Sequence, residues 1–217
     1  MKKIDMQEKY WDSVATQKTF THPIDMEKIR ESIPADGKIL DYGCGYGRTC
    51  IELKNGGFNN VVGIDISSQM ISRGQSSNPG LNIQHFDGAT IPFPDNSFVA
   101  CTLLAVLTCV PTNAGQRQII SEINRVLIPD GVLIVSDYPF QQNAKNQERY
   151  RQFEKEFGLF GTFRLPEGAV VRHHDMLWIY ELLSQFEIIN EDNIDASSMN
   201  GSAVRIFQIL AKKKHDG

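Results

Sequence analysis

The chain has 217 residues, of which 41% are hydrophobic and 22% charged, a length that suits one well-buried α/β domain with a small elaboration. Its formal net charge is -4 at pH 7, so we expect no nucleic-acid partner, because such binding needs a basic face. No apolar run is long enough to cross a bilayer, so we expect no membrane partner.

Residues 1–37 are predicted to form a helical, amphipathic flap that ends in a turn at 34–37. The first residues turn polar at once and contain no signal-peptide apolar stretch. The four cysteines include no C-x-x-C pair and no zinc-like spacing with histidine. We therefore expect reduced thiols, no metal and a cytoplasmic protein.

Strands and helices alternate after the flap. We expect strands at residues 38–42, 61–64, 81–85, 98–104 and 132–136, and helices at 48–54, 67–73 and 116–127. This rhythm predicts a mostly parallel, doubly wound α/β sheet, with a cofactor-binding core over residues 38–138.

The alternation breaks after the fifth strand. Residues 139–174 are too long for a simple loop and are predicted to form a lid insertion beside the acceptor. Residues 175–217 are expected to complete the core with a helix at 175–184 and strands at 186–190 and 203–211, joined by the polar stretch 191–201. The expected sheet has about seven strands, the last of them antiparallel.

The run DYGCGYG at 41–47 follows the first apolar strand and carries glycines at 43, 45 and 47. Glycine takes positive φ and lets a ligand lie against the main chain. The Gly-Lys-Ser/Thr ending of a phosphate-binding loop is absent, and the glycine spacing is tighter than G-x-G-x-x-G. The turn therefore predicts a ligand cradle at the carboxyl edge of the sheet.

Two carboxylates follow the next two strands. Asp65 ends the second strand and can accept hydrogen bonds from a ribose diol; it can also cap the helix that begins near Ser67, and both roles can coexist. Asp87 follows the third strand and can accept from an adenine amine, although an Asp-Gly pair alone is more often a turn.

Together these motifs closely resemble the class I S-adenosylmethionine-dependent methyltransferases, in particular the small-molecule, type 11 group related to the ubiquinone and menaquinone methyltransferases. Residues 41–47 match the family's D-x-G-C-G-x-G motif, and VGIDIS at 62–67 resembles its second motif. FDGA at 86–89 with PFPDNSF at 92–98 resembles the third, and RVLIPDG at 125–131 is similar to R-x-L-K-P-G-G. The resemblance covers roughly residues 36–137.

The resemblance implies a Rossmann-like fold, S-adenosylmethionine as cofactor and S-adenosylhomocysteine as product. The cofactor-binding residues that it implies are Asp41, Gly43, Cys44, Gly45, Gly47, Asp65, Ile66, Met70, Asp87, Gly88, Ala89 and Leu104. Among them Asp41 would orient the cofactor's ammonium group, and Leu104 with Ala105 would lie near the sulfonium. Many relatives carry a histidine within the stretch that here reads LTCV at 107–110, so a base once placed there is missing or relocated.

Methyl transfer is an in-line displacement, so the protein mainly supplies alignment and desolvation. A general base helps when the acceptor is a hydroxyl, a thiol or a protonated amine. The candidates are His173, His174 and, more weakly, Tyr138. The alternative for the two histidines, of near-equal weight, is a pair of surface polar residues before a helix that Asp175 caps.

The acceptor-side candidates are Tyr10, Trp11, His22 and Arg172. The alternatives are packing roles for the aromatic side chains and an ordinary surface role for the arginine. The predicted function is methyl transfer to an O, N or C nucleophile of a small molecule. An RNA or protein methyltransferase and a non-catalytic cofactor-binding relative remain as alternatives, and the oligomeric state is left open between monomer and homodimer.

Overall fold

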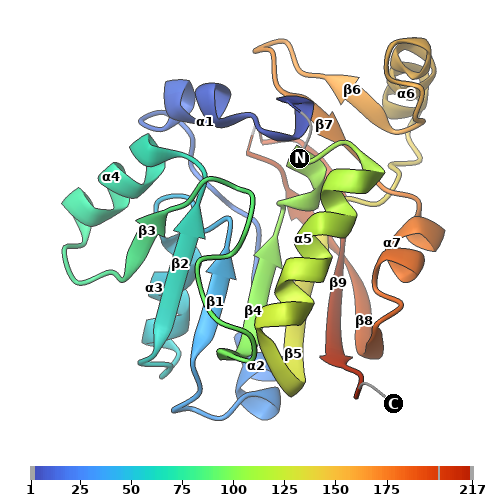
Figure 1. The fold of residues 1–217 in the computed structure, drawn as a ribbon. Coiled ribbons are helices and arrows are strands. Elements are labelled where there is room, and N and C mark those ends of the chain that lie inside the picture. The colour runs from blue at the N-terminus through green and yellow to red at the C-terminus, as the bar shows by residue number, and fades with distance from the viewer. Residues whose placement is uncertain (1–2, 200, 216–217) are drawn as a thin grey trace.

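A seven-stranded sheet runs through the middle of the computed structural model, which describes residues 3–199 and 201–215 (Figure 1). The strand order is β3-β2-β1-β4-β5-β9-β8. The strands are β1 (Ile39–Tyr42), β2 (Val61–Asp65), β3 (Ile83–His85), β4 (Phe98–Leu104), β5 (Leu127–Asp137), β8 (Phe186–Ser197) and β9 (Ala203–Lys213). Strands β1 to β5 are parallel, β9 is antiparallel to β5, and β8 is antiparallel to β9. The predicted mostly parallel α/β sheet is confirmed.

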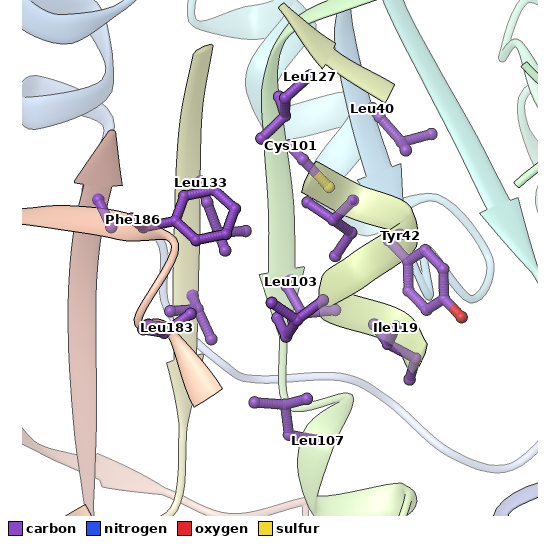
Figure 2. Packing of buried hydrophobic residues seen from close by; sticks show 14 of the residues in the cluster. Leu40, Tyr42, Cys101, Leu103, Leu107, Ile119, Leu127, Leu133, Leu183 and Phe186 are labelled. Atoms are coloured by element: carbon purple, nitrogen blue, oxygen red, sulfur yellow. The ribbon is translucent and has the colours of Figure 1, made fainter. Parts of the chain in front are cut away.

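Helices cover both faces of the sheet. They are α2 (Met26–Ser32), α3 (Arg48–Asn55), α4 (Ser68–Ser77), α5 (Asn113–Val126) and α7 (Met176–Leu182). Because side chains alternate along a strand, neighbouring residues enter different cores. Leu103 and Leu133 pack with Ile119 of α5 on one face (Figure 2), whereas Ala100 and Ile134 lie in the cluster that includes α2 and α3. Burial on both faces explains the near-continuous apolar runs of the strands.

The helices begin where the sequence supplies a capping side chain. The Ser67 hydroxyl accepts from the backbone N–H of Met70 at the start of α4, and Asp175 accepts from Leu177 N–H at the start of α7. Each cap satisfies a backbone donor that has no partner inside its helix.

The N-terminal flap is less helical than predicted. Within the described part of 1–37, the regular elements are η1 (Lys3–Asp5), α1 (Glu8–Val14) and α2, and the chain from 18 to 25 is extended or irregular. Hydrogen bonds to α4 and its cap fix the middle of the flap. Asp12 Oδ1 accepts from the Ser67 hydroxyl at 2.6 Å, and the Arg73 guanidinium donates to the carbonyls of Ala15 and Lys18. The part of the flap that precedes α2 lies over the carboxyl ends of the parallel strands (Figure 1).

The insertion at 139–174 contains α6 (Ala144–Phe157) and a hairpin of β6 (Thr162–Arg164) and β7 (Val170–Arg172), which the sequence analysis missed. Its two ends meet, because His174 N–H donates to Tyr138 O and Phe140 N–H donates to His174 O, each at 2.8 Å. The Gln7 carboxamide binds both backbone groups of Val170. Flap and insertion are thus joined directly.

Two strands are longer than predicted. Strand β8 runs to Ser197, so most of the stretch expected as a connection is paired with β9, down to Ser197 opposite Ala203. The error has a physical cause: β8 is an edge strand with many exposed side chains, so its sequence is polar. Strand β5 begins directly after α5, where Leu127 pairs with Phe98.

Truncation of a fully buried strand residue tests the core. Leu103→Ala, at a side chain with 0% exposure, is expected to lower the free energy of unfolding by about 2–5 kcal/mol, because it removes apolar contacts and leaves a cavity. Urea unfolding measures the loss. The control is Leu177→Ala, at a side chain that is 74% exposed, which should change stability by less than about 0.5 kcal/mol. Equal losses in the two variants would contradict this description of the core.

Candidate active site

A cavity of about 480 Å³ lies at the carboxyl ends of the parallel strands, between the flap and the insertion. Its volume is in the range of small-molecule sites. The strands and the turns and helix start that follow them contribute Asp41, Gly43, Cys44, Asp65, Ile66, Met70, Leu104, Ala105 and Tyr138; the flap contributes Tyr10, Trp11, Phe20 and His22; and the insertion contributes Lys145, Arg149, Phe163 and His173. Most of the predicted site residues are therefore brought together.

The glycine turn forms one end of the cavity. Gly43, Gly45 and Gly47 all have positive φ, at 73°, 54° and 83°. A Cβ on Gly45 would lie 2.2 Å from the ring of Phe20, so the flap approaches the turn as closely as glycine allows. Gly43 lies on the cavity wall, but Gly45 and Gly47 do not: Phe20 covers the first, and the second caps the start of α3. Both glycines shape the turn here, and their direct contact with the cofactor stays a prediction.

Asp65 links two loops at the cavity wall. Its Oδ2 accepts from Gly45 N–H and its Oδ1 from Ser67 N–H, both at 2.8 Å. Burial raises the pKa of this carboxyl, and the two N–H bonds act in the opposite direction. An ionised carboxylate offers about four lone-pair positions, so two remain to accept hydrogen bonds from a ligand.

Asp41 lines the same end of the cavity, and both of its carboxylate oxygens accept hydrogen bonds from neighbouring side chains. Its Oδ1 accepts from the Thr102 hydroxyl at 2.7 Å and its Oδ2 from the Cys50 thiol at 3.3 Å. Burial raises the pKa of Asp41 to about 6 despite these bonds. A cation in the cavity would favour the ionised form of this carboxyl.

Of the third predicted motif, Phe86 lines the cavity, whereas Asp87, Gly88 and Ala89 do not. Asp87 is exposed, and its Oδ1 accepts from the N–H of Ala89 at 2.9 Å, which is a local turn. Gly88 faces the flap, since a Cβ there would lie 2.7 Å from the end of Met6. Asp87 thus forms the local turn that was the alternative interpretation, and the adenine contacts of Asp87, Gly88 and Ala89 stay a prediction.

Three rings lie in a row in the other half of the cavity. Tyr138 lies between two histidines, with its ring centroid 5.5 Å from that of His22 and 5.4 Å from that of His173. Burial, with the nearby Arg48 charge, lowers the pKa of His22 to about 4. Burial, with Arg149, lowers that of His173 to about 3. Both imidazoles are neutral at pH 7.

Two of the predicted residues are structural. His174 is fully buried away from the cavity wall. Its ring nitrogens have no hydrogen-bond partner among the described residues, and Nε2 lies 3.8 Å from Oδ1 of the buried Asp137. Arg172 donates to Asn113 Oδ1 at 2.7 Å and lies over the Trp178 ring, also off the wall. The predicted catalytic role of His174 and acceptor-side role of Arg172 are therefore corrected, and neither residue lies at the surface as the alternatives had it.

Two residues of the insertion, Arg149 and Tyr150, were not predicted from the sequence. Arg149 places its guanidinium 3.6 Å from the centre of the Phe163 ring, and its Nε has no partner within the described chain. Tyr150, on the same polar helix α6, is fully buried and bonds to His173. The sequence pattern indicated the role of Tyr150 only weakly, because α6 is mostly exposed and Tyr150 is the one buried residue in it.

The described residues contain no group of three or more His, Cys, Asp or Glu side chains placed to hold a metal ion. Over the same residues, no helix combines the length and the apolar character that a membrane span requires.

Comparison with known structures places the fold. A crystal structure of a SAM-dependent methyltransferase from Methanosarcina mazei superposes with a TM-score of 0.81 at 28% identity, covering 87% of this chain and 98% of that one. The fold is that of the class I S-adenosylmethionine-dependent methyltransferases. The sequence profile of the type 11 methyltransferase domain matches residues 40–135. Residues 40–135 are therefore similar to a methyltransferase domain, in agreement with the sequence motifs.

Curated relatives resemble the same part of the chain. The demethylmenaquinone methyltransferase of Beutenbergia cavernae is 34% identical over 145 residues, which are 66% of this chain and 55% of that protein. The 2-methyl-6-phytyl-1,4-hydroquinone methyltransferase of Synechocystis is 30% identical over 131 residues, or 58% and 40% of the two chains. The chain spans about half the length of the curated relatives that it matches.

Acid is expected to destabilise the fold through the buried histidines. The pKa of His22 is about 4 in the folded chain, so the unfolded chain, with a histidine pKa near 6.5, binds a proton first as the pH falls. Stability is therefore lost between about pH 6.5 and 4, by roughly 3 kcal/mol for this residue. Urea unfolding at pH 7 and pH 4.5 measures it.

His22→Gln should remove most of its own share of this acid sensitivity. His85→Gln is the matched control, because the His85 side chain is 45% exposed. If both variants keep the acid sensitivity of the parent chain, His22 is not held neutral by burial.

Proposed function

We propose that the protein is an S-adenosylmethionine-dependent methyltransferase that transfers a methyl group to an O, N or C nucleophile of a small molecule. The observation that carries this proposal is one cavity that joins the glycine turn and Asp65 at one end to the ring row of Tyr138 at the other. The methyltransferase domain at 40–135 and the names of the curated relatives support it.

The residues present at the first end suit the cofactor. Asp65 has two lone-pair positions left for the ribose hydroxyls. Gly43 and Cys44 lie on the cavity wall, and Gly43 has no side chain to keep a ligand from the main chain. The cofactor would also be held by Asp41, Ile66, Met70 and Leu104. When bound, it supplies a methyl group made electrophilic by a positively charged sulfur.

The second end suits a small acceptor with an apolar body. Phe163, Leu165 and Val171 line it, and the charged side chains that the insertion contributes are Lys145 and Arg149. A cavity of about 480 Å³ that must hold both ligands leaves little room for a macromolecular chain. The small-molecule interpretation is therefore favoured over RNA or protein, and flap and insertion would exclude water from the transfer.

Cofactor binding is tested by thermal unfolding with S-adenosylmethionine or S-adenosylhomocysteine. At about 100 times the dissociation constant, the ligand should stabilise the fold by roughly 2.7 kcal/mol. Asp65→Asn should lose most of this stabilisation, because it replaces an acceptor oxygen with a donor. Asp36→Asn, at an exposed residue, is the control. The absence of any shift in the parent protein would refute the cofactor assignment.

The acceptor class is tested by methyl transfer from radiolabelled S-adenosylmethionine into a fractionated cell extract. We expect label in the small-molecule fraction, because flap and insertion both contribute walls to the cavity and narrow the space for the acceptor. Label confined to RNA or to protein would contradict the proposed substrate class. If no fraction gains label while the cofactor binds, the protein is a non-catalytic relative.

A further inference from the structure

The proton on the Ser136 hydroxyl fixes the orientation of His22. Ser136 Oγ lies 2.7 Å from the carbonyl oxygen of Phe207 and 2.7 Å from Nε2 of His22. Two oxygens at that distance need a proton between them, and only the serine can supply it. The hydroxyl therefore accepts from His22, so Nε2 carries the hydrogen and Nδ1 carries a lone pair.

The Nδ1 of His22 is available to a ligand. It has no hydrogen-bond partner among the described residues. Unlike both ring nitrogens of His174, it is also not fully buried, so a ligand can reach it. His22 lines the cavity, and the backbone of His22 is held by Arg48, whose guanidinium donates to its carbonyl at 2.6 Å. A neutral imidazole with one free lone pair in a cavity is a proton acceptor.

His173 presents the opposite group. The Tyr150 hydroxyl accepts from the backbone N–H of Gln141 at 3.1 Å and lies 2.6 Å from Nδ1 of His173. Tyr150 is fully buried, so its own proton needs an acceptor, and Nδ1 is the one in reach. In the neutral ring the hydrogen is then on Nε2, which has no partner among the described residues and can donate into the cavity.

We propose that His22 is the general base that takes the proton of the methyl acceptor, and that His173 donates a hydrogen bond to that acceptor. This assignment rests on the proposed methyltransferase function and differs from the sequence analysis, in which His173 was a candidate base and His22 an acceptor-side candidate. His22 is well placed, because it bonds to Ser136, the residue beside Leu104 in the β4–β5 register. Ser136 is a positioning residue.

The proton balance is simple. The acceptor's electron pair forms the bond to the methyl carbon, and the carbon–sulfur pair stays on sulfur. The proton on the attacking atom moves to Nδ1 of His22, and the resulting imidazolium releases it to solvent. The acceptor becomes strongly acidic as it gains the methyl group, so a base of low pKa is sufficient at that point.

Nitrogen-15 NMR of the full chain labelled at its five histidines tests the assignment without any turnover. Signals are assigned by their loss in His22→Gln and His173→Gln. We expect an unprotonated Nδ1 and a protonated Nε2 in both rings at pH 7. Ser136→Ala should change the tautomer balance of His22 alone, and Tyr150→Phe that of His173 alone. A protonated Nδ1 on His22 in the parent chain would overturn the proposal.

Kinetics with the acceptor fraction that the parent protein labels form the second arm. His22→Gln should lower kcat by about 10²- to 10⁴-fold with cofactor binding retained, and His173→Gln should mainly raise KM. Full kcat in His22→Gln would refute the base. If the parent chain labels nothing, the proposed function fails instead, and the tautomers measured by NMR still decide whether His22 offers its lone pair to the cavity.

Discussion

The in-register parallel pairing of β1 with β2 and β4 is the constraint on which the rest of the structure depends. Ile39 lies opposite both Val61 and Ala100, so the three strands end at the same height. Their following turns, with Gly43 and Asp65, therefore meet at one edge, where open α/β sheets bind ligands. Each strand must be buried on both faces to hold this register, and the two apolar clusters do so. The cavity is a consequence of this core.

The sequence predicted this half of the molecule well, for a physical reason. Apolar strands, capping residues such as Ser67 and a glycine run at 41–47 are local signals, and each needs only its neighbours in sequence to be interpreted. The family resemblance rests on the same local motifs. The surroundings of residues 87–89 depend on a distant segment, because Met6 of the flap lies against Gly88. No periodicity could show that contact.

The acceptor half was harder to predict because its walls come from segments far apart in the chain. His22, Tyr138 and His173 meet only through tertiary packing, and the roles of the two histidines depend on which hydrogen bond each already makes. Ser136 and Tyr150 carry that information, and neither belongs to a motif. The polar edge strand β8 was predicted as a connection for a similar reason. An exposed edge strand and an exposed loop are both rich in polar residues, so composition does not distinguish them.

The flap joins the two ends of the cavity within a few residues. Phe20 lies on Gly45 at the glycine turn, and two residues further on His22 packs against Tyr138 in the row of three rings. A ligand that orders the flap at one end thus orders it at the other, so the second ligand meets a wall that has already lost its conformational freedom. Any coupling between the affinities for cofactor and acceptor has the same free energy whichever ligand binds first.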